Sequence, residues 1–156
     1  MTDSFDIPNP PIRLLVTFQE RFPDQALTWL VKAPGWDMWA AAASCDGYNL
    51  TLAAPDLDSQ TSFTLRSAKT KRTVSNRPLP RWARYPAGIL VVLGEMGLEI
   101  SGLNIALVGE EPPGPRYEYA LGVAFLVLAY NIHGQDYTRE GLVEVIERVR
   151  REYMEE

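Results

Sequence analysis

The chain has 156 residues, of which 46% are hydrophobic and 22% are charged, and its formal net charge is −5. This length can bury a substantial core, and the composition excludes general disorder. Residues 1–156 are therefore expected to form a single domain, with residues 1–10 flexible.

Membrane and secreted proteins are also excluded by sequence. The longest apolar run, residues 123–130, is too short to span a bilayer. The N-terminus lacks a secretory pattern, and the single cysteine, Cys45, excludes an internal disulfide. We expect a cytoplasmic protein with no membrane partner.

The first half of the chain predicts one helix followed by strands. Pro11 suits the first turn of a helix over residues 11–21. Alternating residues predict strands at 28–32, 48–52 and 62–66, with a weaker candidate at 70–76.

The second half turns helical. Apolar spacing predicts a helix from Tyr85 to Met96 capped by Gly97, then a strand at 103–108. Residues 118–130 predict a helix buried on most of its circumference. A last helix carries an apolar stripe from Leu142 to Tyr153, with predicted i,i+4 ion pairs Glu144–Arg148 and Glu147–Arg151.

Strands followed by helices, with one strand between them, predict a two-layer α+β domain. No internal repeat or domain boundary is present.

One basic segment interrupts the acidic chain. Residues 66–84 contain no acid and seven cations: Arg66, Lys69, Lys71, Arg72, Arg77, Arg81 and Arg84. Such a stripe can bind nucleic acid. The segment has no interleaved aromatics apart from Trp82, so a solvated pair of edge strands is the preferred interpretation. Nucleic acid is an unfavoured partner.

Three consecutive patterns carry a family resemblance. They are Trp82, Tyr85 and Gly88; then Ile100, Gly102, Leu103 and Ile105; then the segment 111–120, Glu-Pro-Pro-Gly-Pro-Arg-Tyr-Glu-Tyr-Ala. Together they resemble the N-terminal half of galactokinases and their relatives, the GHMP small-molecule kinases. That family has a W-x-x-Y-x-x-G helix and an I-x-G-L-x-I strand before a P-x-G-x-G-L-S-S-S-A phosphate loop. The resemblance implies a mixed β-sheet with helices on one face, as in domain 2 of a ribosomal protein.

The phosphate loop departs from the family pattern. Pro113 and Gly114 are kept, but Arg116 stands in place of the second glycine, and Glu118 replaces a serine. A Gly/Ser loop binds phosphate through close backbone approach and free amides at a helix N-terminus. Glu118 places a carboxylate there, and Arg116 could offset part of the repulsion. We expect a vestigial site, with the cleft around Gly114 filled by Tyr117, Tyr119 and Trp36.

A sugar-binding segment of the family reads A-P-G-R-x-N-L-I-G-E-H-x-D-Y. Here Ala33-Pro34-Gly35 survives, Trp36 replaces the arginine, and Ala42 and Ala43 fall where glutamate and histidine would bind sugar hydroxyls. Asp46 and Gly47 match a following D-G-F or form a plain turn, which we prefer. Trp36, Asp46 and Gly47 are thus vestigial sugar positions.

The last helix resembles the family helix that precedes the catalytic aspartate, and the sequence stops at Glu156 before that residue. No other catalytic set is evident. A lone His133 at a helix end favours capping, and one histidine with one cysteine makes zinc improbable.

The sequence therefore predicts a galactokinase-like domain without catalytic residues, metal or cofactor. It would serve as a binding, scaffold or regulatory module, as a homo-oligomer or with a protein partner. One alternative is half of a split or truncated sugar kinase, which would use Mg-ATP with a partner chain. Another is an anion or nucleic-acid binder that uses residues 66–84.

Overall fold

The computed structural model describes residues 10–155. The expectation that residues 1–10 are flexible falls on residues 1–9, outside the described residues, and on Pro10 at their edge. The described part contains a five-stranded mixed sheet in the order β1-β2-β5-β3-β4. All neighbouring strands are antiparallel except β3 and β5, which are parallel. The strands are β1 Trp29–Lys32, β2 Met38–Ser44, β3 Leu50–Ala54, β4 Ser59–Phe63 and β5 Leu103–Gly109.

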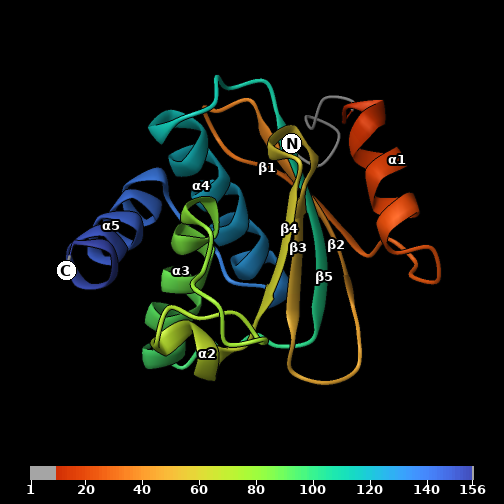
Figure 1. Ribbon diagram of the computed structural model, residues 1–156. Coiled ribbons are helices and arrows are strands. Elements are labelled where there is room, and N and C mark those ends of the chain that lie inside the picture. Colours follow the sequence, from red (N-terminus) through yellow and green to blue (C-terminus); the bar gives the residue numbers. More distant parts are fainter. Residues whose placement is uncertain (1–9, 156) are drawn as a thin grey trace.

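Four helices cover one face of the sheet and one helix covers the other (Figure 1). The four helices on the first face are α2 Leu65–Lys69, α3 Arg84–Glu95, α4 Pro115–Ile132 and α5 Arg139–Val149. Short turns of helix lie at η2 Pro55–Leu57, η3 Arg81–Ala83 and η4 Arg150–Met154. The predicted α+β fold with helices on a mixed sheet is confirmed. The helix predicted at 11–21 is α1 Ile12–Arg21, and it lies on the opposite face of the sheet. The strand β2 was not predicted.

The alanine-rich strand β2 explains how both faces can be covered. Its side chains alternate, so Ala40 and Ala42 join the core under α4, while Ala41 and Ala43 join the smaller core under α1. In α1, Leu14 and Phe18 are one helical turn apart and both point into that smaller core.

Two helical glycines set the close packing of the helical layer. A Cβ on Gly88 of α3 would lie 2.6 Å from Val149 of α5, and one on Gly122 of α4 would lie 2.8 Å from Tyr85. The glycine of the W-x-x-Y-x-x-G pattern is therefore needed for helix contact.

Most predicted elements are present, but three expectations were wrong. The strand predicted at 62–66 ends at Phe63, because the Thr64 side chain accepts a hydrogen bond from the Ser67 amide and begins α2. The strand predicted at 70–76 is a loop with one isolated bridge, because Lys71 and Asn76 have positive φ. The basic segment is accordingly not a pair of edge strands.

The predicted ion pairs along α5 were also wrong. Arg148 pairs with Glu152 and with Glu95 of α3, and Glu147 pairs with Arg150. The chain continues past α5 as a wider π turn, which changes which side chains meet.

Candidate functional site

The segment that resembles a phosphate loop lies at the upper end of the sheet in Figure 1. There β5 ends at Gly109, a turn covers residues 110–114, and α4 begins at Pro115. Gly114 has φ 128° and ψ −160°, a conformation that glycine adopts readily and other residues rarely do. No side chain caps the helix.

Only part of an anion-binding helix end remains at this turn. Pro115 has no N–H, and the Glu118 N–H already donates to the Gly114 carbonyl at 3.0 Å. The helical bonding pattern leaves the N–H groups of Arg116 and Tyr117 without an acceptor within the helix.

Two carboxylates flank this helix end, and both are more buried than the cations that neutralise them. The Glu118 side chain is 15% exposed and pairs with Arg81, which is 77% exposed, at 3.1 Å. The Glu111 side chain is 12% exposed and pairs with Arg116, which is 70% exposed, at 3.6 Å. The fixed charges at the turn are therefore negative, and the positive charges lie outside them.

The turn between β1 and β2 packs against the same loop. The Asp37 amide donates to the Glu111 carboxylate at 3.0 Å. The Trp36 ring lies 5.5 Å from the Tyr119 ring, and the Arg116 guanidinium lies 5.1 Å from the Trp36 ring centre. These contacts hold Arg116 against protein groups on two sides.

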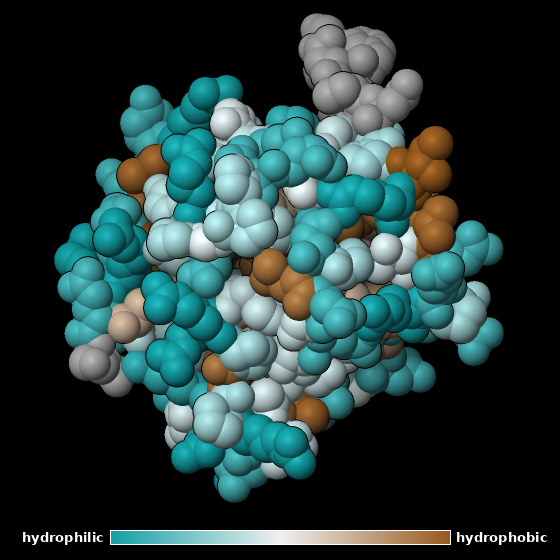
Figure 2. All heavy atoms as spheres, turned by 45° about the horizontal axis from the view of Figure 1, so that its top comes forward, coloured by the Kyte–Doolittle hydropathy of each residue, from teal (hydrophilic) through white to brown (hydrophobic). Residues whose placement is uncertain are grey.

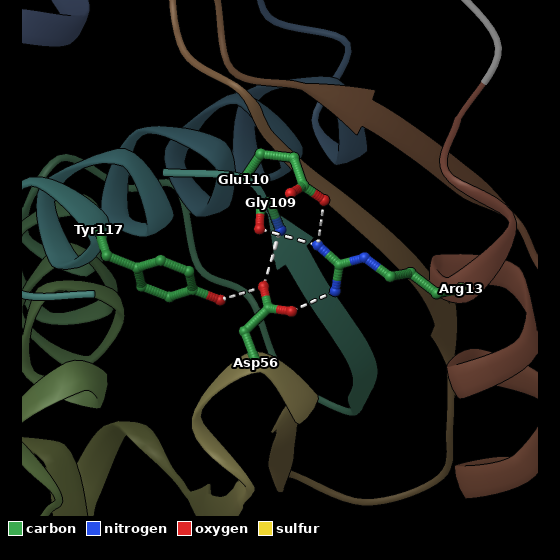
Figure 3. Close-up of polar contacts among 5 residues, drawn as sticks. All are labelled: Arg13, Asp56, Gly109, Glu110 and Tyr117. Carbon is green, nitrogen blue, oxygen red and sulfur yellow. Dashed lines mark hydrogen bonds and ion pairs between the residues drawn. The ribbon is translucent and has the colours of Figure 1, made fainter. Parts of the chain in front are cut away.

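A polar network ties the loop to α1 and η2 (Figure 3). Asp56 accepts hydrogen bonds from the Gly109 amide at 2.9 Å and the Tyr117 hydroxyl at 2.7 Å, and it pairs with Arg13. Arg13 also donates to the Gly109 carbonyl at 2.8 Å and to Glu110 at 2.9 Å. Four segments thus meet at the Asp56 carboxylate, namely η2 itself, α1, the end of β5 and α4.

The network changes the ionisation of its members. Burial raises the pKa of Tyr117 far above its usual value, and the bond to Asp56 adds to this, so the phenol stays a donor. Burial by itself would lower the pKa of Arg13, but Asp56 and Glu110 outweigh it, and the net shift is upward. Arg13 and Tyr117 therefore stay protonated and keep the loop bound to the sheet.

The structure brings together only some of the sequence-predicted positions. Pro113, Gly114, Arg116 and Trp36 lie at the upper end. Asp46 and Gly47 are exposed in the loop after β2, at the lower end of the sheet, because seven strand residues separate the two ends.

The remaining expectations about this site need correction. Ala42 and Ala43 cannot line one sugar pocket, because adjacent strand residues point to opposite faces and both are buried. Tyr117 does not fill the turn, since it points into the core toward Asp56. A Cβ on Gly114 would meet nothing within 4 Å, so the space at the turn is open.

Sequence analysis missed the Asp56 network entirely. Its charged partners, Arg13 and Asp56, are 43 residues apart, and Tyr117 is 61 residues beyond Asp56. No recognisable motif surrounds Arg13 or Asp56. The only available signal was an isolated arginine in an otherwise apolar helical turn.

Residues 10–155 contain neither a metal-binding cluster nor a membrane-spanning helix. In that part of the chain, no three His, Cys, Asp or Glu side chains are grouped to hold a metal ion. Over the same residues, no helix combines the length and apolar character that a bilayer crossing requires.

Comparison with solved structures identifies the fold. The chain is similar to the galactokinase of Lactococcus lactis in complex with galactose, with a TM-score of 0.70, 17% identity, and coverage of 92% of this chain and 42% of that one. It is also similar to a mevalonate kinase, with a TM-score of 0.61, 12% identity, and coverage of 83% and 39%.

A third similar structure is the phosphomevalonate kinase of Streptococcus pneumoniae, with phosphomevalonate and AMPPNP bound. The TM-score is 0.51 at 17% identity, with 78% of this chain and 35% of that one covered. The chain thus has the fold of the N-terminal part of GHMP kinases and spans about two-fifths of the length of these enzymes. Neither the protein-family models nor the curated proteins include a match to it.

Proposed function

We propose that this chain uses a GHMP-kinase scaffold without transferring phosphate, and that it acts in the cytoplasm as a binding, scaffold or regulatory module. The observation that carries the proposal is the pair of carboxylates, Glu111 and Glu118, beside the N-terminus of α4. Both are largely buried, so water screens them less than it would screen surface acids.

The negative charges at the turn disfavour binding of a nucleoside triphosphate. Two unit charges 4 Å apart repel by about 4 kcal/mol at an effective dielectric near 20. The nearby guanidiniums of Arg81 and Arg116 are already paired with these acids. Mg-ATP is therefore not an expected cofactor of this chain.

The proposed module works through contact with another protein chain, either a second copy or a different partner. Its support is α1, whose outer face exposes Ile12, Leu15 and Val16. Hydrophobic side chains gather at the edge of the molecule where α1 lies, on the right in Figure 2. Light scattering should give a mass above the monomer at tens of micromolar, or a partner should co-purify. A monodisperse monomer without a partner contradicts this part.

A second candidate is half of a split sugar kinase. The open space at Gly114 and the exposure of Arg116 favour it, because a guanidinium as exposed as that of Arg116 gains little from its ion pair and could turn to a ligand. Titration calorimetry separates the two functions. Millimolar or tighter binding of Mg-ATP, with sugar phosphorylation when other polypeptides are added, supports the split kinase. No heat with Mg-ATP, galactose or mevalonate supports the module.

A further inference from the structure

The lower end of the sheet carries a cavity unrelated to the phosphate-loop turn. It has a volume of about 540 Å³ and lies between the loop after β2, α2 and the segment before β5. Tyr48, Leu65 and Ile100 supply an apolar lining, and the exposed Arg66 and Lys69 also line the cavity. Volumes of 300–1,000 Å³ with an apolar lining and few polar groups are typical of small-molecule sites.

The cations of this cavity are available to a ligand. Among residues 10–155, neither Arg66 nor Lys69 has an ion pair or a hydrogen bond of its side chain. Of the described residues that line the cavity, Glu99 alone is acidic. Its backbone carbonyl lies 2.9 Å from His133 Nε2, a contact that joins this segment to the end of α4. The cavity therefore has an excess of positive charge and an anchored wall.

A second, polar recess continues from the first. It has a volume of about 410 Å³ and shares Thr64 and Arg66 with the apolar cavity. Its lining adds Thr70, Arg72 and Thr73. The Thr70 hydroxyl already donates to the Ser67 carbonyl, and the Thr73 hydroxyl is bonded to that of Ser75. Arg66 is thus the cation that both spaces share, and guanidinium donors bind carboxylate and phosphate oxygens.

We infer that these two spaces form one binding site for a small organic anion with an apolar body. The apolar part lies against Tyr48, Leu65 and Ile100, and the carboxylate or phosphate lies at Arg66, between the two recesses. The segregation of apolar and cationic lining carries this assignment, because a purely polar anion would leave the first cavity wet and a neutral apolar ligand would leave Arg66 unpaired. The site lies at the other end of the sheet from Gly114, so it does not depend on the function proposed above.

Titration calorimetry with octyl phosphate tests the site, with 1-octanol and inorganic phosphate as the two half-ligands. We expect octyl phosphate to bind, and each half-ligand to bind at least about tenfold more weakly. Lys69→Glu and Arg66→Glu should each weaken octyl phosphate by about tenfold or more. Both residues are exposed, so these variants should fold. Arg151→Glu, an exposed charge reversal on η4, is the matched control and should bind as the unmodified protein does.

Each contrary result overturns the inference in a different way. Absence of octyl phosphate binding at 5 mM removes the site. Equal binding of inorganic phosphate means that the apolar cavity contributes nothing, and equal binding of 1-octanol means the same for the cations. Unchanged affinity in both charge-reversal variants places the ligand elsewhere. Sedimentation with anionic phospholipid vesicles, without binding of monomeric octyl phosphate, assigns the cations to a membrane surface instead.

Discussion

Cations at the upper end of the sheet are paired with acids, whereas in the described part of the chain two cations at the lower end are not. At the upper end, Arg13, Arg81 and Arg116 are each paired with a carboxylate. At the lower end, Arg66 and Lys69 have no side-chain partner among the described residues, and Arg72 contacts the Asn76 carbonyl. The upper end resembles a kinase loop in sequence, whereas the lower end has the unpaired charge.

This difference shows that the course of the backbone and the charge of the side chains are separate properties of a site. A backbone can keep the course of a phosphate loop while its side chains make the anion position negative. A cavity at the far end can carry the unpaired cations that the turn lacks. Charge pairing therefore indicates where an anion could bind more directly than the course of the backbone does.

The largest expected effect comes from breaking the upper network at its centre. Asp56→Ala removes the acceptor of the Gly109 amide and the Tyr117 hydroxyl and leaves Arg13 with fewer partners. We expect the free energy of unfolding to fall by about 3 kcal/mol. Chemical denaturation measures this, with exposed Asp24→Ala as the control. A loss below about 1 kcal/mol would mean that the loop is not held by this carboxylate.

A smaller change sharpens the same point. Tyr117→Phe keeps the buried ring but removes one hydrogen bond to Asp56, so the free energy of unfolding should fall by about 1.5 kcal/mol. Tyr137→Phe is the matched control, because that ring stacks on Tyr130 and no described residue bonds its hydroxyl. Equal losses in the two variants would show that the Tyr117 hydroxyl contributes no specific stability.

Removing one negative charge should make the upper end more like the lower. Glu118→Gln should strengthen the binding of inorganic tripolyphosphate by about tenfold, or about 1.4 kcal/mol. This is about a third of the roughly 4 kcal/mol of repulsion at 4 Å, because solvent, salt and Arg81 offset the rest. Stability should change by less than about 1 kcal/mol, because Arg81 is exposed. Glu140→Gln, in the first turn of α5, is the control. Equal gains in tripolyphosphate affinity in the two variants would mean that the gain comes from the net charge of the protein and not from the position of Glu118.

The smallest effect concerns the thiol at the lower end. Burial raises the pKa of Cys45, and the Asp46 charge adds to the rise, so less thiolate is present at pH 8 than in a free cysteine. Asp46→Asn should lower the pKa of Cys45 and speed its alkylation at pH 8 by about twofold. The rates of the variant and the unmodified chain should converge at a pH above the Cys45 pKa of both proteins. Asp24→Asn should leave the rate unchanged. A slower reaction in Asp46→Asn would mean that the Asp46 charge does not raise the pKa of Cys45.

The sequence predicted most of the fold because local signals agree with packing there. The helix over 84–95, β5 and the buried α4 follow from periodicity, and the helix cap at Gly97 is confirmed by its φ of 84°. The failures at 62–66 and 70–76 have local causes, namely a capping box at Thr64 and positive φ at Lys71 and Asn76.

The candidate site was less predictable than the fold. The sequence placed Glu118 in the first turn of the helix correctly, but Arg116, expected in the loop, lies inside α4, which begins at Pro115. It could not show that Arg116 and Arg81 pair with acids, nor that Asp46 lies far from Trp36, because these facts depend on strand direction and long-range contacts. The lower cavity combines segments around residues 48, 65 and 100, which no local pattern connects.

We propose that the carboxylates of Glu111 and Glu118 exclude an anion from the start of α4. Amide NMR shifts of Gly114, Arg116 and Tyr117 during titration with Mg-ATP test it directly, in the unmodified chain and in Glu118→Gln. The account predicts no saturable shift in the unmodified chain at 5 mM and a measurable one in the variant. Saturable shifts at these amides in the unmodified chain, at millimolar nucleotide or below, would contradict it.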